Sequence, residues 1–222
     1  MPWAFHTLLS ARWCALATMP INKLSEPELS KGFAKASALL AVVTLLGACS
    51  PKLDWRIVQS PQESYTALFP GKPDKLERRI SYQDQELLQT LEAVKIDDDI
   101  YSIGSIQLPV NQIASLSTLL SQLQNNVLER AKATGGIVEE ESATYQTASR
   151  QRLSTQDYFI TLKSNGKAQQ FIRVRWITRP MNDGGVWVYQ VSVLHTNANS
   201  NDAKLFLSKE EYANFFNDFS PE

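Results

Sequence analysis

The chain has 222 residues, of which 43% are hydrophobic and 20% are charged, and its formal net charge is −1. This composition is that of an ordinary globular protein with one or two domains, and the charge excludes the basic footprint of a nucleic-acid-binding domain. The two cysteines, Cys14 and Cys49, both precede the predicted domain. That domain therefore has no disulfide framework, no thiolate metal site and no cysteine nucleophile.

An apolar run near the N-terminus ends at a cysteine. Lys31 and Lys35 lead into residues 36–48, ASALLAVVTLLGA, and Cys49 follows directly. A membrane-spanning helix needs about 20 apolar residues, whereas the core of a signal peptide needs roughly 7–15 after a basic flank. We therefore predict that residues 1–48 are a signal peptide.

The end of this run resembles the bacterial lipobox, in which Leu and two small residues precede a cysteine. The matching residues are Leu46, Gly47, Ala48 and Cys49. In that family the cysteine sulfur receives a diacylglycerol, the peptide is cut before the cysteine, and the new amino terminus is acylated. The resemblance implies signal-peptidase recognition at Leu46, Gly47 and Ala48 and a covalent lipid on Cys49. Ser50, where an Asp favours the inner membrane, implies an anchor in the outer membrane, facing the periplasm.

The segment before the basic flank is long for a signal peptide. We interpret residues 1–18 as an upstream extension that is not translated, with Met19 as the true start. The alternative for the whole apolar run is a short core helix that happens to end in a cysteine. On the lipobox interpretation, residues 49–54 are a tether and residues 55–222 are a single domain.

The domain begins with strand signals. Two short candidates, 55–58 and 64–69, precede the sequence PGKP at 70–73, which has to turn. Acidic and amide turns then separate three longer candidates and predict an antiparallel meander. These three are KLERRISY (75–82), ELLQTLEAVKI (86–96) and IYSIGSIQL (100–108).

The period of the apolar residues then changes from two to between three and four, which predicts an amphipathic helix. It runs from about Ser115 to Ala133 and ends at Gly135-Gly136, where glycine accepts a left-handed cap. The stripe consists of Ile113, Leu116, Leu120, Leu123 and Val127.

The second half is dominated by a hairpin signal. Asn165-Gly166 separates two strand-like runs and favours a type I′ turn. The simplest pairing across this turn puts Phe159 beside Ile172 and Asp157 beside Val174. A further strand is predicted over 186–196.

The chain closes with SKEEYANFFNDF, residues 208–219. Ser208 and Glu211 have the spacing of a capping box, which predicts a helix that begins at Ser208. Its aromatic residues form a stripe that would pack on the sheet: Tyr212, Phe215, Phe216 and Phe219.

Strands, helix, strands and helix with antiparallel hairpins predict the α+β class, a sheet with helices packed on its faces. The early YTALFPGKPDK and the closing YANFFNDF resemble the PsbP-like family, whose members include small bacterial envelope lipoproteins. The resemblance implies an α/β/α sandwich over most of residues 55–220. It also implies a binding or assembly-factor role, and it carries no catalytic site that could be transferred to this chain.

A polar row in the predicted sheet is the candidate binding surface. With the simplest pairing, Arg173 and Arg175 share a face with Gln156, Tyr158 and Gln190. This face would suit an anionic ligand or a protein partner, and the competing interpretation is an ordinary solvent-facing side of an antiparallel sheet. If the face is exposed, charge reversal at both arginines changes stability by less than about 1 kcal/mol.

Signals for chemistry are few. Clustered carboxylates at Asp97–Asp99 suit a hard cation, but three neighbours cannot all point one way, so a solvated turn is favoured. His195 lies in no metal-binding motif. We therefore predict a non-catalytic binding or assembly module without metal or cofactor, whose partners are the membrane and an envelope protein. The alternative is an envelope hydrolase or transferase that uses Asp97–Asp99 together with Asp157.

Overall fold

The computed structural model describes residues 52–82, 85–200 and 202–222, all of which belong to one compact unit, Pro51–Glu222. The predicted signal peptide, Cys49 and the first residues of the predicted tether lie outside the described residues. Among the helices that are described, none has the length and apolarity needed to cross a membrane.

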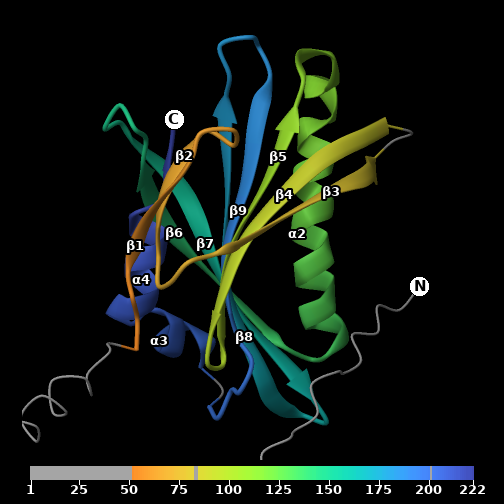
Figure 1. Ribbon diagram of the computed structural model, residues 1–222. Helices are drawn as coiled ribbons and strands as arrows, with labels where there is room; N and C mark the ends of the chain where they lie inside the picture. The colour runs from red at the N-terminus through yellow and green to blue at the C-terminus, as the bar shows by residue number, and fades with distance from the viewer. Residues whose placement is uncertain (1–51, 83–84, 201) are drawn as a thin grey trace, which may run out of the picture. The chain divides into compact units, whose positions relative to one another are not determined.

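A seven-stranded antiparallel sheet forms the centre of the unit (Figure 1). Its order is β3-β4-β5-β9-β8-β7-β6, so the predicted meander β3-β4-β5 is confirmed, and the fold is α+β as predicted. The strands are β3 (Asp74–Tyr82), β4 (Gln85–Ile96), β5 (Asp99–Leu108), β6 (Ile137–Gln146), β7 (Arg152–Ser164), β8 (Lys167–Pro180) and β9 (Val186–His195).

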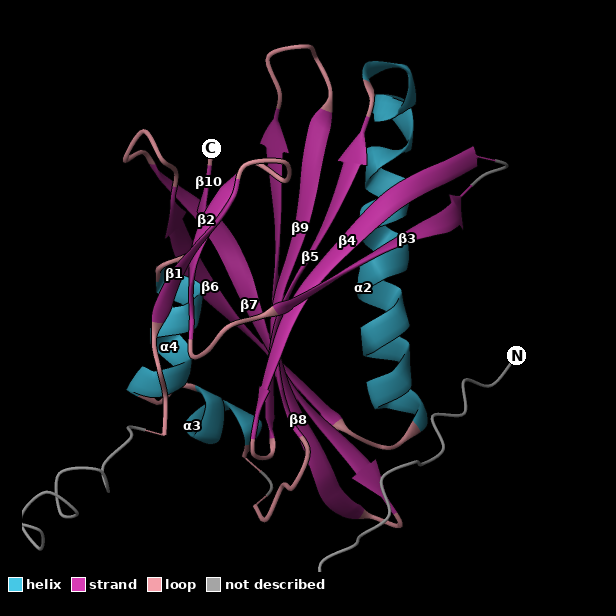
Figure 2. Cartoon of the chain, in the orientation of Figure 1, coloured by secondary structure: helices cyan, strands magenta, loops and turns pink. Residues whose placement is uncertain are grey.

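One face of this sheet carries a smaller sheet and two short helices (Figure 2). The small sheet has the order β1-β2-β10, and β10 brings the C-terminus beside β2. The elements are β1 (Arg56–Ser60), β2 (Tyr65–Phe69), α3 (Ala203–Leu207), α4 (Glu210–Asn217) and β10 (Ser220–Pro221). The core on this side is rich in aromatic residues, among them Phe69, Tyr101, Tyr189, Phe215, Phe216 and Phe219.

The opposite face is covered in part by α2 (Leu116–Ala133), which a 3₁₀ helix, Val110–Ser115, precedes. Leu119 and Ala131 are its buried residues, and they pack on separate patches of the sheet. The helix ends where the sequence predicts, because Gly135 takes a φ of +66° and the amide of Gly136 donates to the carbonyl of Ala131.

The closing helix begins later than predicted. Ser208 ends α3 instead of capping α4, whose N-cap is Lys209 with no side-chain hydrogen bond. The side-chain cap is found one helix earlier, where Asp202 accepts from the amide of Leu205 at 2.7 Å. The capping-box prediction was therefore wrong, because the short helix α3 occupies the residues before it.

The hairpin of β7 and β8 forms at Asn165-Gly166, and both residues have positive φ, as a type I′ turn requires. Its register is not the simple one. The pairing shifts between Leu162 and Lys163, and the extra residue brings Arg173 opposite Phe159 and Arg175 opposite Asp157. A slip of one residue exchanges the two faces of a strand relative to its partner, so the predicted pairing of Phe159 with Ile172 and of Asp157 with Val174 was wrong.

Candidate functional site

The register shift places both arginines of the candidate site on the inner face, under α3 and α4. Arg173 is 7% exposed and Arg175 is 1% exposed, and Asp157, at 2%, lies between them. Across β9 the neighbours of the arginines are Val193 and Val191. The predicted solvent-facing row with Gln156, Tyr158 and Gln190 is therefore wrong for the two arginines.

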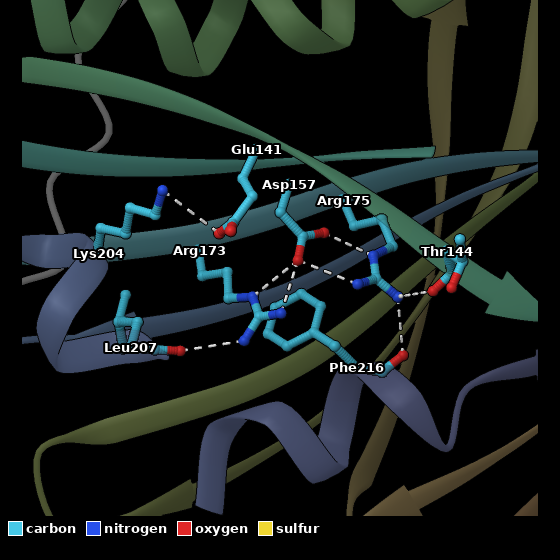
Figure 3. Close-up of polar contacts among 8 residues, drawn as sticks. All are labelled: Glu141, Thr144, Asp157, Arg173, Arg175, Lys204, Leu207 and Phe216. Atoms are coloured by element: carbon cyan, nitrogen blue, oxygen red, sulfur yellow. Dashed lines mark hydrogen bonds and ion pairs between the residues drawn. The ribbon is translucent and has the colours of Figure 1, made fainter. Parts of the chain in front are cut away.

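A single carboxylate holds both guanidinium groups (Figure 3). Arg173 donates to Oδ2 of Asp157 through Nε at 3.0 Å and Nη2 at 2.6 Å. Arg175 donates to Oδ1 through Nε at 2.6 Å and to Oδ2 through Nη2 at 3.0 Å. These are charge-assisted contacts in the geometry that guanidinium and carboxylate groups favour.

The remaining donors reach the C-terminal ends of the two short helices. Arg173 Nη1 donates to the carbonyl of Leu207, the last residue of α3, at 3.0 Å. Arg175 Nη1 donates to the carbonyl of Phe216 in the last turn of α4 at 2.9 Å. The guanidinium of Arg173 also lies 4.1 Å from the centre of the Phe216 ring. A cation at a helix C-terminus is stabilised by the helix dipole, so this cluster fastens α3 and α4 to the sheet.

Burial affects the protonation equilibrium of Arg173. It lowers the pKa of the Arg173 guanidinium from its ordinary value, while the charge of Asp157 opposes that effect. Two cations face one anion here, and Glu141, which also contacts Lys204 at 3.6 Å, adds a weaker negative charge at the rim.

The other three residues of the predicted site lie on the opposite face, next to α2. Trp176, not an arginine, is their neighbour: its Nε1 donates to Oε1 of Gln190 at 3.0 Å. The rings of Tyr158 and Trp176 meet edge to face at 5.3 Å, and the Tyr158 hydroxyl donates to Gln156 at 3.2 Å. Gln156, Tyr158 and Gln190 therefore do come together. With Trp176 they form a polar and aromatic surface beside α2, which is called the shelf below.

A hollow of about 960 Å³ connects the two sides of the sheet at β6. Its lining combines Gln156, Tyr158 and Trp176 of the shelf with the arginine cluster on the other face, and the edge strand β6 lies between these two parts. The residues that the prediction missed are Gln124, Glu141, Ser142, Ala143, Thr144, Ser154, Thr155, Phe159, Trp176, Ser208, Ala213 and Asn217. The alternation of polar residues with Ala143 and Tyr145 in 142–146 is a signal that could have found the β6 part, but nothing in the sequence assigns it to an edge.

The carboxylates of the alternative, enzymatic hypothesis do not converge. Asp157 lines the large hollow, whereas Asp97–Asp99 line another of about 250 Å³. There, Oδ1 of Asp99 lies 2.7 Å from Nδ1 of His195, and Nε2 of His195 lies 3.1 Å from the carbonyl of Asn197. The hydroxyl of Tyr212 donates to the second oxygen of Asp99 at 3.1 Å. The ring of His195 thus contacts the start of β5 through Nδ1 and the loop after β9 through Nε2.

Within the described ranges, no group of three or more His, Cys, Asp or Glu side chains is arranged to hold a metal ion. No protein-family model matches the chain, and no curated protein is significantly similar to it in sequence.

Proposed function

We propose that this chain is a lipid-anchored lipoprotein of a bacterial envelope that works as a non-catalytic binding module. The observation that carries the binding role is the hollow around β6, which is lined by hydroxyl, amide and aromatic groups together with Glu141 and the buried Asp157–arginine cluster. Polar and aromatic groups of this kind orient a bound ligand.

The anchor is supported by the sequence around Cys49 and by the start of the fold. Lys52, three residues later, already contacts Asp97 at 2.9 Å, and the amide of Asp54 donates to the carbonyl of Pro70. Cys49 itself lies outside the described residues, and on this proposal its thiol is the acceptor of the lipid. Ser50 favours the outer membrane, facing the periplasm, as the place of the anchor.

The resemblance to the PsbP-like family is part of the same proposal. The PGKP turn follows β2, and the closing helix packs Phe215 and Phe216 on the sheet, in the places that the resemblance implies. It supports an assembly or binding role, with an envelope protein as the partner.

Two measurements test the proposal in cells. The chain should incorporate a labelled palmitate. Globomycin should leave the lipidated precursor uncleaved in the membrane, and the Cys49→Ser variant should take up no palmitate and should not mature. A photocrosslinking amino acid at Gln156 should trap a partner that the same group at Glu77, exposed on the far edge strand β3, does not trap. Unchanged maturation of the Cys49→Ser variant would refute the anchor, and equal crosslinking at both positions would refute the binding surface.

A further inference from the structure

The shape of the large hollow follows a strand edge. Four consecutive residues of β6, 141–144, line it, and so do six consecutive residues of β7, 154–159. Successive side chains of a strand point to opposite faces. The lining includes Gln124 of α2 on one face and Ala213 and Asn217 of α4 on the other, so the hollow extends over both faces at the edge of the sheet.

Within the described chain no second strand pairs with β6, although the carbonyl of Thr144 accepts from Nη1 of Arg175 at 3.4 Å. β6 is the last strand of the sheet order and pairs with β7 alone. An edge strand presents unpaired N–H and C=O groups, and a further strand would lie about 4.8 Å away. Most of the ten residues of β6 are exposed, and even the apolar Ile137 is 42% exposed.

We propose that an extended peptide segment of a partner protein, bearing lysine or arginine side chains, adds to β6 as an eighth strand. This inference rests on the proposed binding role and names the chemistry of its partner. Side chains of the added strand would alternate between the two halves of the hollow. One set would lie over the rim at Glu141 and Asn217, and the other over the shelf at Gln156 and Tyr158.

The charge of the edge selects a basic partner. Glu139, Glu140 and Glu141 are all exposed on β6, and among the described residues their one ion pair is the 3.6 Å contact of Glu141 with Lys204. Opposite charges on neighbouring strands stabilise pairing and like charges oppose it. The same three charges also discourage indiscriminate edge-to-edge pairing, so the edge should accept a strand only when the incoming charges are positive.

Hydrogen exchange on the full-length protein in detergent provides the test. Two peptides as long as β6 are compared, one alternating lysine with valine and the other glutamate with valine. The basic peptide should slow exchange at alternate amides of 137–146 and bind roughly tenfold more tightly than the acidic one. Its binding should weaken as salt is added. Equal binding of the two peptides, or protection of another strand, would overturn the proposal.

Charge-reversed variants sharpen the comparison. The triple variant Glu139→Lys, Glu140→Lys and Glu141→Lys should prefer the acidic peptide, whereas Glu77→Lys on β3 should behave as the original protein does. If the triple variant does not fold, the salt dependence of the original protein still decides the outcome.

Self-association through β6 in the absence of peptide, seen as a dimer in sedimentation, would instead assign the edge to a second copy. Cys49→Ser should leave peptide binding unchanged, which separates this proposal from the lipid anchor.

Discussion

Asp157 is the residue on which the arrangement of α3 and α4 depends. It is 2% exposed and accepts hydrogen bonds from two buried guanidinium groups, which in turn reach the carbonyls of Leu207 and Phe216. Removing one partner of a buried ion pair leaves an uncompensated charge, which costs far more than the pair contributes. Removing Asp157 would leave two uncompensated charges, those of Arg173 and Arg175.

We therefore expect Asp157→Ala to lower the free energy of unfolding by at least about 3–5 kcal/mol. Charge reversal at Arg173 or Arg175 should be similarly severe, contrary to the expectation for an exposed face. Urea unfolding followed by circular dichroism measures the loss. The exposed Arg152 provides the control, since Arg152→Ala should change stability by no more than about 0.5 kcal/mol. A loss below about 1 kcal/mol in Asp157→Ala would contradict the cluster.

Two buried tyrosines differ in what their hydroxyl groups contact. The hydroxyl of Tyr189 donates to the carbonyl of Glu63 at 2.8 Å, whereas the buried hydroxyl of Tyr65 lies near Ser60 and Glu92 but makes no hydrogen bond of normal geometry among the described atoms. A buried polar group without a partner costs stability, and a satisfied one contributes about 1 kcal/mol. Tyr65→Phe should therefore be neutral or stabilising, and Tyr189→Phe should be destabilised by about 1 kcal/mol in thermal unfolding. The opposite order would show that the Tyr65 hydroxyl has a partner.

At the scale of elements, the junction of α2 and β6 depends on two adjacent glycines with different requirements. Gly135 has positive φ and open space around it, while a Cβ on Gly136 would lie 2.1 Å from the carbonyl oxygen of Thr161 in β7. Gly135→Ala meets only the cost of a left-handed conformation, about 1–2 kcal/mol. Gly136→Ala has to move β7 or the end of α2, so we expect a larger loss of stability. Urea unfolding of the two variants makes the comparison, and equal losses would contradict this account.

The elements also show what local sequence can predict. The meander, α2 and the hairpin turn were predictable because their signals lie within a few residues: alternation, a helical period, and Asn165-Gly166. The face of Arg173 and Arg175 was not, because it depends on one extra residue in β8 beyond the turn. That residue is stabilised from outside the hairpin, since the carbonyl of Gln169 accepts from the amide of Ala198 at 3.1 Å. A contact between residues so far apart in the chain cannot be predicted from the periodicity of the sequence.

The candidate site was predictable in part for the same reason. Gln156, Tyr158 and Gln190 do share a face, because β8 differs by one residue from its predicted register against both β7 and β9, and the two shifts cancel. Their aromatic neighbour Trp176 and the edge position of β6 follow from the strand order, which hairpin signals do not specify for the outer strand.

For the molecule as a whole, alkaline pH should be destabilising. Burial raises the pKa of Tyr65, Tyr101, Tyr189 and Tyr212 above the ordinary value of about 10. Below that value the phenols are protonated in both states. Above it the unfolded chain ionises first, so the stability they contribute is lost as the pH rises. Each of Tyr65 and Tyr189 can remove up to about 1.4 kcal/mol per pH unit, and urea unfolding between about pH 8 and about pH 11 should show the decline. Tyr65→Phe should reduce the slope, and a flat profile would contradict the burial.

The proposed lipid also constrains how the whole molecule lies on a membrane. Lys52 is three residue steps from Cys49, and an extended chain spans at most about 3.5 Å per residue, so the backbone of Lys52 would lie within about 10 Å of that of Cys49. Lys52 contacts Asp97 and lines a hollow with Asp98 and His195. This end of the sheet would therefore face the bilayer.

The opposite end, the turn before β9, should stand clear of the membrane. β9 has ten residues, which at about 3.3 Å each separate the two ends of the sheet by roughly 30 Å. A spin label at Asp98 should consequently relax strongly with a paramagnetic headgroup lipid, and a label at Asn182 should not. Inserting a flexible spacer directly after Ser50 should remove the difference, because the constraint is the length of the tether and not an affinity of the surface. Equal relaxation at the two sites in the original protein would mean that the body is not held by a lipid at position 49.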